Sequence, residues 1–196
     1  AKVDVKGRLW VGLALGAGEE SRGVGVAVVD LKTSTVKIHG RAADLPQTPG
    51  ALGIESDVTG AAFTAGVTYL ASRQGVIRID ANGAVQVFTE NHGLRSELIR
   101  DVAVATDGQV YIATSGGLGR YDGKAWHFAE FGPQASRVTA VAAAPDGSVW
   151  FGSDTGVHRL KNKKVTTWDD AKGLLERKVR SIALDPQGRV WALHTS

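Results

Sequence analysis

The stretch DVAVATDGQVYIATSGGLGRYDGKAWHFA, residues 101–129, decides the fold class. Residues 101–106 form a mostly apolar run, which is typical of a strand buried on both faces. Asp107-Gly108 and Asp122-Gly123 are dipeptides that favour tight hairpin turns. Between them, Ser115-Gly116-Gly117 separates two further short runs of strand-forming residues. The stretch therefore predicts four short antiparallel strands in sequence.

The second strand of this unit belongs to a repeat that occurs five times. Glycine, any residue, an apolar residue, an aromatic residue and an apolar residue follow one another in GRLWV (7–11), GVTYL (66–70), GQVYI (108–112), GSVWF (147–151) and GRVWA (188–192). The aromatic residues are separated by 59, 42, 39 and 41 positions. A period near 40 residues with four strands per unit is the signature of propeller blades. The sequence thus predicts an all-β propeller of four-stranded antiparallel blades, in which the repeated aromatic rings fill the gaps between neighbouring blades.

The strand count predicts about four and a half blades within a single propeller unit covering residues 1–196. The predicted blades cover residues 1–40, 57–90, 97–131 and 137–168, and an incomplete one covers 178–196. A closed ring needs whole blades, but the last blade lacks its two outer strands. We therefore expect the ring to be completed by further residues of a longer protein or by a second chain.

Two segments resemble a known family. HGLRSELIRDVAVATDGQVYIATSGGLGRYDG (92–123) and KGLLERKVRSIALDPQGRVWALHTS (172–196) are similar to the two-component regulator propeller repeat, and RVTAVAAAPDGSVWFGSDTGVHRL (137–160) resembles its second half. The resemblance implies a propeller that serves in the extracytoplasmic sensor region of bacterial signalling proteins. On this basis we expect a periplasmic or extracellular location.

Composition excludes several classes of site and partner. The chain has no cysteine, which excludes disulfides, thiolate metal sites and cysteine nucleophiles. The formal net charge is only +3, and no aromatic platform accompanies the basic run at 161–164, so we expect no nucleic-acid partner. No apolar stretch approaches the 18 or so residues needed to cross a membrane. The five histidines are scattered and known catalytic motifs are missing, so we expect no catalytic residue, metal or cofactor.

One face of the predicted propeller carries the longer loops. In a four-stranded antiparallel blade, the loop between the second and third strands and the connection to the next blade emerge on the same side. The first repeat interval exceeds the others, and its surplus falls at 13–22 and 40–57. Recognition residues favour loops on a rigid scaffold, so we predict a binding face there; tolerated loop variation is the alternative. The segments of this face are 13–22, 40–57, 90–97, 132–137 and 170–178.

Basic residues gather at the predicted start of the inner strands. Arg100, Thr139 and Arg180 occupy equivalent repeat positions that border the central channel on this face. Clustered guanidinium groups favour a carboxylate or a sulfated sugar as ligand. The alternative is ordinary solvation, or pairing with the acids Glu97, Asp101, Asp170 and Glu176. The candidate ligand-binding residues are Arg95, Arg100, Arg137, Arg180, Lys178, His92 and Asp101.

These observations favour a non-catalytic binding or sensing module. Its ligand would be a small molecule, anionic or carbohydrate, or a protein partner in bacterial signalling. A propeller enzyme, namely a lyase or lactone hydrolase with a metal in the channel, is the alternative from another class. A structural scaffold for protein assembly is the third.

Overall fold

The computed structural model describes residues 2–15, 22–40, 57–128 and 137–194. Their strands form five antiparallel sheets, four of four strands and one of two. Blade 1 consists of β1 (Lys2–Val3), β2 (Arg8–Leu15), β3 (Arg22–Asp30) and β4 (Thr35–Gly40). Blade 2 consists of β5 (Val58–Phe63), β6 (Thr68–Ser72), β7 (Gly75–Ile79) and β8 (Val85–Phe88). Blade 3 consists of β9 (Ile99–Val104), β10 (Val110–Thr114), β11 (Gly117–Tyr121) and β12 (Trp126–His127).

Blade 4 consists of β13 (Val138–Ala143), β14 (Val149–Ser153), β15 (Val157–Lys161) and β16 (Lys164–Trp168), and blade 5 of β17 (Val179–Leu184) and β18 (Val190–His194). The only helical elements in the described residues are two short 3-10 turns, Glu90–His92 and Asp170–Lys172. The predicted all-β propeller architecture is therefore confirmed, and so is the count of four blades and a half.

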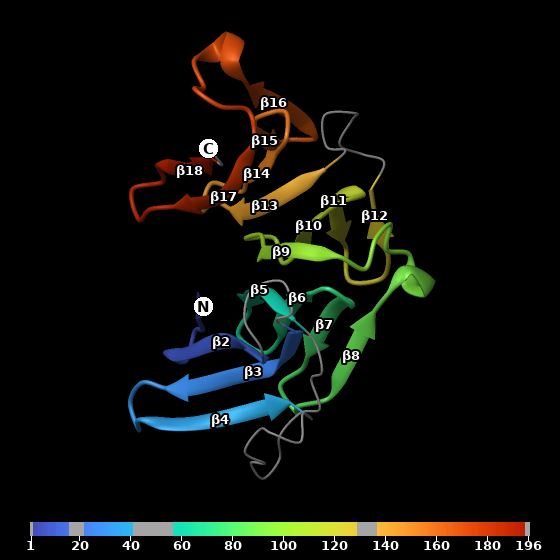
Figure 1. The fold of residues 1–196 in the computed structure, drawn as a ribbon, viewed down its shortest axis with the longest axis vertical. Helices are drawn as coiled ribbons and strands as arrows, with labels where there is room; N and C mark the ends of the chain where they lie inside the picture. Colours follow the sequence, from blue (N-terminus) through green and yellow to red (C-terminus); the bar gives the residue numbers. More distant parts are fainter. Residues whose placement is uncertain (1, 16–21, 41–56, 129–136, 195–196) are drawn as a thin grey trace.

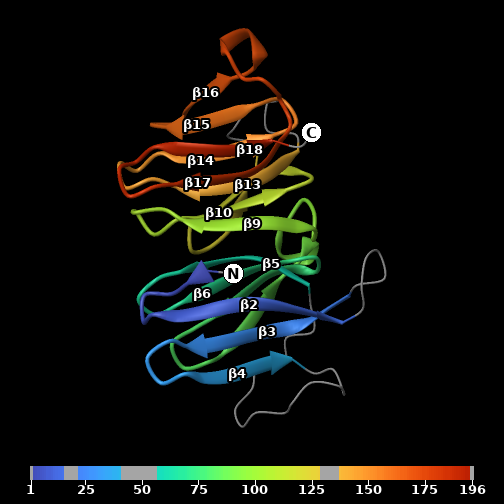
Figure 2. The same cartoon turned by 60° about the vertical axis from the view of Figure 1, so that its left-hand side comes forward.

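The blades follow one another along the long axis of the molecule, with blade 1 at one end and blades 4 and 5 at the other (Figures 1 and 2). The inner strands β5, β9, β13 and β17 contact one another in succession. This succession is what a propeller requires, because the first strand of each blade lines the central channel. Both chain ends lie on the same side in Figure 1.

The hairpin turns form where the Asp-Gly and Asn-Lys dipeptides predict them. Gly108 and Gly147 have φ of 83° and 78°, in the left-handed region that glycine adopts without steric cost. Asn162 and Lys163 have φ of 52° and 61°, which is the two-residue turn that matches strand twist. The side chain of Asp107 accepts a hydrogen bond from the amide N of Gln109 and so closes its own turn.

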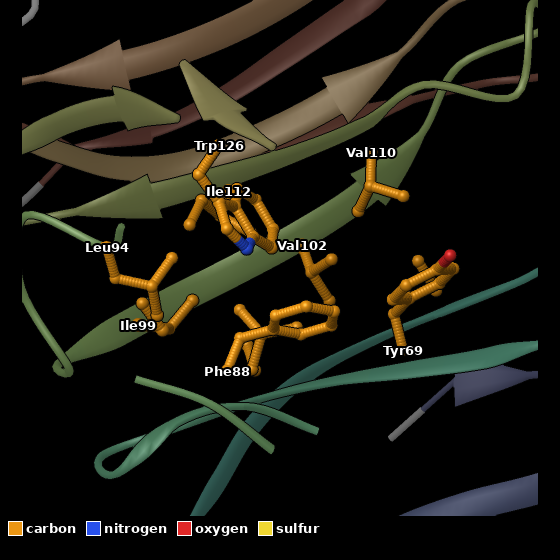
Figure 3. Packing of buried hydrophobic residues seen from close by; sticks show 11 residues of the cluster. Tyr69, Phe88, Leu94, Ile99, Val102, Val110, Ile112 and Trp126 are labelled. Atoms are coloured by element: carbon orange, nitrogen blue, oxygen red, sulfur yellow. The ribbon is translucent and has the colours of Figure 1, made fainter. Parts of the chain in front are cut away.

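Side chains from neighbouring blades interdigitate to form the core. Figure 3 shows the layer between blades 2 and 3, where Phe88 of β8 meets Trp126 of β12, with ring centroids 5.7 Å apart. Val102 and Ile112 of blade 3 are fully buried in the same layer. Equivalent layers join blades 1 to 2, 3 to 4 and 4 to 5. Packing between blades, rather than within a sheet, therefore accounts for most of the buried apolar surface.

The repeated aromatic residues fill these layers in four of the five blades. Trp10, Tyr69 and Tyr111 are 5–8% exposed, and Trp150 is half-buried against the ring of Trp168. For Trp191 the gap-filling prediction is wrong: its side chain is 60% exposed. The reason is that this position faces the next blade along, and none of the described residues forms a further blade on blade 5.

The first predicted loop is shorter than expected. The prediction placed residues 13–22 in a loop, but β2 continues to Leu15 and β3 begins at Arg22. The two strands pair up to their ends, with Leu15 opposite Arg22. Residues 16–21, and residues 41–56 of the second predicted loop, lie outside the described residues.

Candidate functional site at the channel face

Four inner strands share a β-bulge at the same repeat position. In β5, β9, β13 and β17 the pairing with the second strand skips one residue. The skipped residues are Thr59, Arg100, Thr139 and Arg180. A bulge leaves its extra residue outside the ladder and redirects its side chain, which is why bulges are frequent beside binding sites. The channel end of this face thus carries a ring of redirected side chains that alternates threonine and arginine.

The two threonines hold adjacent blades together. The Thr59 hydroxyl donates to the carbonyl oxygen of Ile99 at 2.7 Å, and the Thr139 hydroxyl donates to that of Val179 at 2.5 Å. Each acceptor directly precedes the bulge arginine of the next blade. The threonines therefore fix the backbone on which Arg100 and Arg180 are mounted.

The two arginines have no such structural task. Within the described residues, the side chain of neither Arg100 nor Arg180 makes a hydrogen bond or an ion pair, and the Nε of Arg100 is buried without a partner. Arg100 is half-buried and Arg180 is exposed. A buried guanidinium nitrogen without an acceptor is costly. An anion at this position would supply the missing acceptor.

Two similar connections lead into the arginine strands. Each has a 3-10 turn followed by a left-handed glycine, Gly93 with φ of 93° and Gly173 with φ of 92°. The candidate His92 is part of the first turn: its Nδ1 lies 3.2 Å from the amide N of Thr89 and accepts from it. His92 is exposed, and its ring also meets Phe88 edge-on. It therefore stabilises the connection, and among the described residues no hydrogen bond or ring contact joins it to the bulge arginines.

The candidate Asp101 is engaged in joining inner strands. One oxygen of its carboxylate accepts from the amide N of Val141 at 3.1 Å, and the other lies 3.5 Å from Nζ of Lys2. These contacts connect β9 to β13 and to β1. Asp101 thus contributes to the channel wall as a structural acceptor.

No hydrogen bond or ion pair among the described residues joins the other candidates to the bulge arginines. The Arg95 guanidinium stacks over the Phe128 ring at 5.4 Å, whereas Arg137 and Lys178 are exposed and make no hydrogen bond or ion pair with described residues. The alternative pairing of the arginines with the four acids is not found in the described part of the chain. Asp170 instead binds Arg177 at 2.6 Å, and Glu97 accepts from the amide of Glu90.

A cleft between blades 1 and 2 was missed by the sequence reasoning. It lies on the opposite side, among the tight hairpin turns, and has a volume of about 970 Å³. Trp10, His39 and Phe63 line it, with Arg8 and Lys37 among its polar residues. Blade 2 has Ile79 where blade 3 has Tyr121, as the strand pairing shows. The smaller side chain of Ile79 leaves the space between blades 1 and 2 partly unfilled. Comparing side-chain sizes at equivalent repeat positions is the signal that could have revealed the cleft.

Burial controls the charge state of the histidine in this cleft. The His39 ring is 6% exposed and stacks on Trp10, with centroids 6.2 Å apart. Loss of hydration, aided by the charges of Lys37 and Arg8, lowers the pKa of His39 to about 4. The imidazole is therefore neutral at pH 7.

Neither a clustered metal site nor a membrane-spanning helix is found in the described ranges. No group of three or more His, Asp or Glu side chains is placed to hold a metal ion in the described ranges. Among the described residues, no helix has the length and apolar character of a membrane span.

Comparisons with known proteins identify the fold and not the family. No family model matches the sequence, and no curated protein matches it. The extracellular domain of a B. thetaiotaomicron protein described as a hybrid two-component system superposes with a TM-score of 0.64 at 16% identity, over 94% of this chain and 25% of that one. Virginiamycin B lyase from Staphylococcus aureus gives 0.66 at 12% identity, over 95% and 67%. A protein described as a gluconolactonase gives 0.60 at 10% identity, over 88% and 66%.

These similarities confirm the predicted resemblance at the level of the fold. The chain shares its propeller architecture with the extracellular domain of a protein described as a two-component system, and it spans a quarter of that domain's chain. The same architecture is shared with a lyase. Because one fold supports both kinds of protein, its function must be argued from the residues of the site.

Proposed function

We propose that residues 1–196 form one non-catalytic propeller unit that binds a small anionic ligand at the channel face. The ligand class is a carboxylate or an acidic or sulfated sugar. The observation that carries the proposal is the pair of bulge arginines without acceptors, Arg100 and Arg180, set at the same repeat position two blades apart. Guanidinium groups bind planar anions through paired N–H donors.

The site fits a sensing role better than a chemical one. The residues around the arginines offer donors, but Asp101 is occupied as an acceptor and His92 folds its own turn. A recognition module outside the cytoplasmic membrane, within a bacterial signalling protein, is consistent with this arrangement. The similarity to the extracellular domain of a protein described as a hybrid two-component system supports this setting.

The test is calorimetric titration with sulfate, citrate and a sulfated disaccharide. We expect the double variant Arg100→Ala/Arg180→Ala to lose at least about tenfold in affinity, because each charged hydrogen bond contributes about 1.5–3 kcal/mol. The matched control is Lys32→Ala/Lys124→Ala, which removes two exposed positive charges from the opposite hairpin side. It should bind as the unmodified chain does.

Two results would overturn the proposal. If no probe binds at physiological salt, the site does not recognise these anions. If an anion binds equally well to the double arginine variant, recognition lies elsewhere, and the cleft containing Arg8 and Lys37 is the next place to examine.

The alternatives make different predictions. A lyase or lactone hydrolase with a channel metal would retain stoichiometric Ca, Mg or Zn after purification, which elemental mass spectrometry detects. A structural scaffold would instead copurify with a stable protein partner and bind none of the anions.

A further inference from the structure

The cleft between blades 1 and 2 shares no lining residue with the bulge positions of the channel face. Its volume of about 970 Å³ lies at the upper end of the range of about 300–1,000 Å³ that is usual for small-molecule sites. Its two walls belong to blades that each have four strands, so the cleft does not depend on a further blade. What it can bind follows from its own residues.

The neighbouring layer, between blades 2 and 3, shows how such a space is filled. There the Phe88 ring meets the rings of Tyr121 and Trp126, with centroids 5.1 and 5.7 Å apart. Trp126 stands edge-on to Phe88, at an interplanar angle of 78° (Figure 3), which is a favourable geometry for two aromatic rings. Two rings of blade 3 thus pack against one ring of blade 2.

The layer between blades 1 and 2 lacks this pair of rings. By the strand registers, Ile79 is the counterpart of Tyr121, and Val85 is that of Trp126. Trp126 is 8% exposed, whereas Val85 is 44% exposed. On blade 1, His39 has the position of the phenylalanine, and it lines the cleft together with Ile79. The cleft therefore lies where two aromatic rings pack in the next layer.

The wall that blade 1 contributes is also smaller than its counterparts. Arg78, Arg120 and Arg159 have the position of Val28 in blades 2, 3 and 4. In blade 4 the Arg159 guanidinium lies over the Trp150 ring, 5.5 Å from its centroid. Blade 1 thus has neither a long side chain nor a charge at this position.

The floor of the cleft is apolar, and the charges around it balance. Trp10, Val28 and Ile79 are 5–6% exposed and belong to one cluster. Burial lowers the pKa of His39 to about 4, so its ring carries no charge at pH 7. The charged lining residues are three carboxylates and three cations, namely Asp4, Asp30, Asp80, Lys6, Arg8 and Lys37. The cleft therefore has no excess of either charge that would attract an ion.

We propose that this cleft binds an uncharged, planar aromatic compound of one or two fused rings. Its rings lie between His39 and Ile79, in the place that the two rings of blade 3 have in the next layer. Polar substituents find hydrogen-bonding groups in Thr68 and Asn82, whose side chains line the cleft and make no hydrogen bond with described residues. The site is independent of the anion site, because Arg100 is not among its lining residues and neither is any other bulge residue.

NMR titration of the isotope-labelled chain with 2-naphthol tests the proposal. We expect nuclear Overhauser effects between the naphthol ring protons and the methyl groups of Val28 and Ile79, and shifts of the amide signals of residues 79–83, which line the cleft. Sulfate should not displace the naphthol, since the proposed anion site is a different one. This measurement therefore separates the fate of the two proposals.

Two variants fill the cleft from opposite walls with residues that other blades carry at the same positions. Ile79→Tyr introduces the ring of blade 3, and Val28→Arg introduces the arginine of blades 2, 3 and 4. We expect each to weaken naphthol binding at least about tenfold, because the ligand ring can no longer leave water for an apolar place. Lys124→Tyr, which adds the same ring on an exposed hairpin turn, is the control and should bind as the unmodified chain does.

The melting temperature of each variant shows that it is folded. If folded Ile79→Tyr and Val28→Arg bind 2-naphthol as tightly as the unmodified chain, or if no binding occurs up to the solubility limit, the cleft is not the site of such a ligand. Equal affinity for the saturated analogue 2-decalol would mean that planar rings are not selected. Much tighter binding of 2-naphthoate, or displacement of naphthol by sulfate, would mean that the cleft recognises anions instead.

Discussion

At the scale of single residues, the same hydrogen-bonded group of Asp, Arg and Trp occurs in blades 1 and 5, with the indole buried in one and exposed in the other. Asp4 accepts hydrogen bonds from the backbone N and the Nε of Arg8 and from Nε1 of Trp10, and Asp185 does the same for Arg189 and Trp191. Burial opposes the charge on Asp4, but these donors outweigh it and hold its pKa at about 2. The local sequence therefore forms the same set of hydrogen bonds twice. Whether the indole is buried depends only on the residues that pack against it.

His158 gives a prediction at this scale, for the pH dependence of stability. Its ring is fully buried, between the hydroxyls of Ser153 and Thr167 at 2.8 Å each, and burial lowers its pKa to about 4. An unfolded histidine takes up a proton near pH 6.5. Between pH 6.5 and 4 the unfolded state thus binds more protons, so stability falls as the pH is lowered, by up to about 3 kcal/mol for this residue.

Melting temperatures at pH 7, 5.5 and 4.5 check this expectation. The double variant His158→Ile/Thr167→Val places there the residues that blade 2 has at the equivalent positions, Ile77 and Val87. It should show a shallower loss of melting temperature in acid than the unmodified chain. An equally steep loss would mean that His158 does not control this interval.

At the scale of the element, a glycine stands at the start of the third strand in blades 2 and 4. Gly75 has φ of 119° and Gly156 has φ of 139°, and both lie in tight contact with the last strand of their blade. A Cβ on Gly156 would overlap the carbonyl oxygen of Trp168, and one on Gly75 would overlap that of Phe88. The turn between the second and third strands therefore depends on glycine for both its conformation and its space.

We expect Gly156→Ala to destabilise the chain by at least about 1–2 kcal/mol, because backbone strain and overlap with the main chain act together. Gly66→Ala is the control, since a Cβ there meets only the methyl group of Ala81 at 3.8 Å. Urea unfolding followed by tryptophan fluorescence measures both. Equal midpoints for the two variants would contradict this account of the third strand.

At the scale of the whole molecule, stability is carried from blade to blade. In a repeat array each unit contacts only its neighbours, so the units at the ends have the fewest contacts. β10 is buried throughout, whereas β18 alternates between exposed and half-buried residues. In the described residues, blade 5 also has two strands where each other blade has four.

Hydrogen exchange should follow this gradient. We expect the paired amides of β17 and β18 to exchange faster than those of β9 and β10, because local opening needs less energy where fewer buried contacts break. Uniform protection across the blades would instead indicate a single cooperative unit.

Much of the fold could be predicted because it is encoded locally. Asp-Gly and Asn-Lys turns, apolar inner strands and a ring every 40 residues each specify their strand without reference to distant residues, so the blade count was correct. The length of β2 could not be predicted, because Leu15 pairs with Arg22 across a stretch that reads as a loop. Within the candidate site, the repeat pattern predicted that Arg100 and Arg180 occupy equivalent positions. It did not predict the β-bulges that redirect their side chains.

The sequence by itself determined the repeat, the turns and the alternation of residues between two faces, since these depend on neighbours along the chain. Only the tertiary structure decided which residues at equivalent repeat positions have the same burial and the same hydrogen-bond partners. Asp101 accepts a hydrogen bond that joins two inner strands, and Thr59 and Thr139 donate hydrogen bonds from one blade to the next. Trp191 is exposed, whereas its counterpart Trp10 is buried. The physical reason is that burial and partner choice are properties of the contact between blades, and the repeat sequence cannot say which blade has a neighbour.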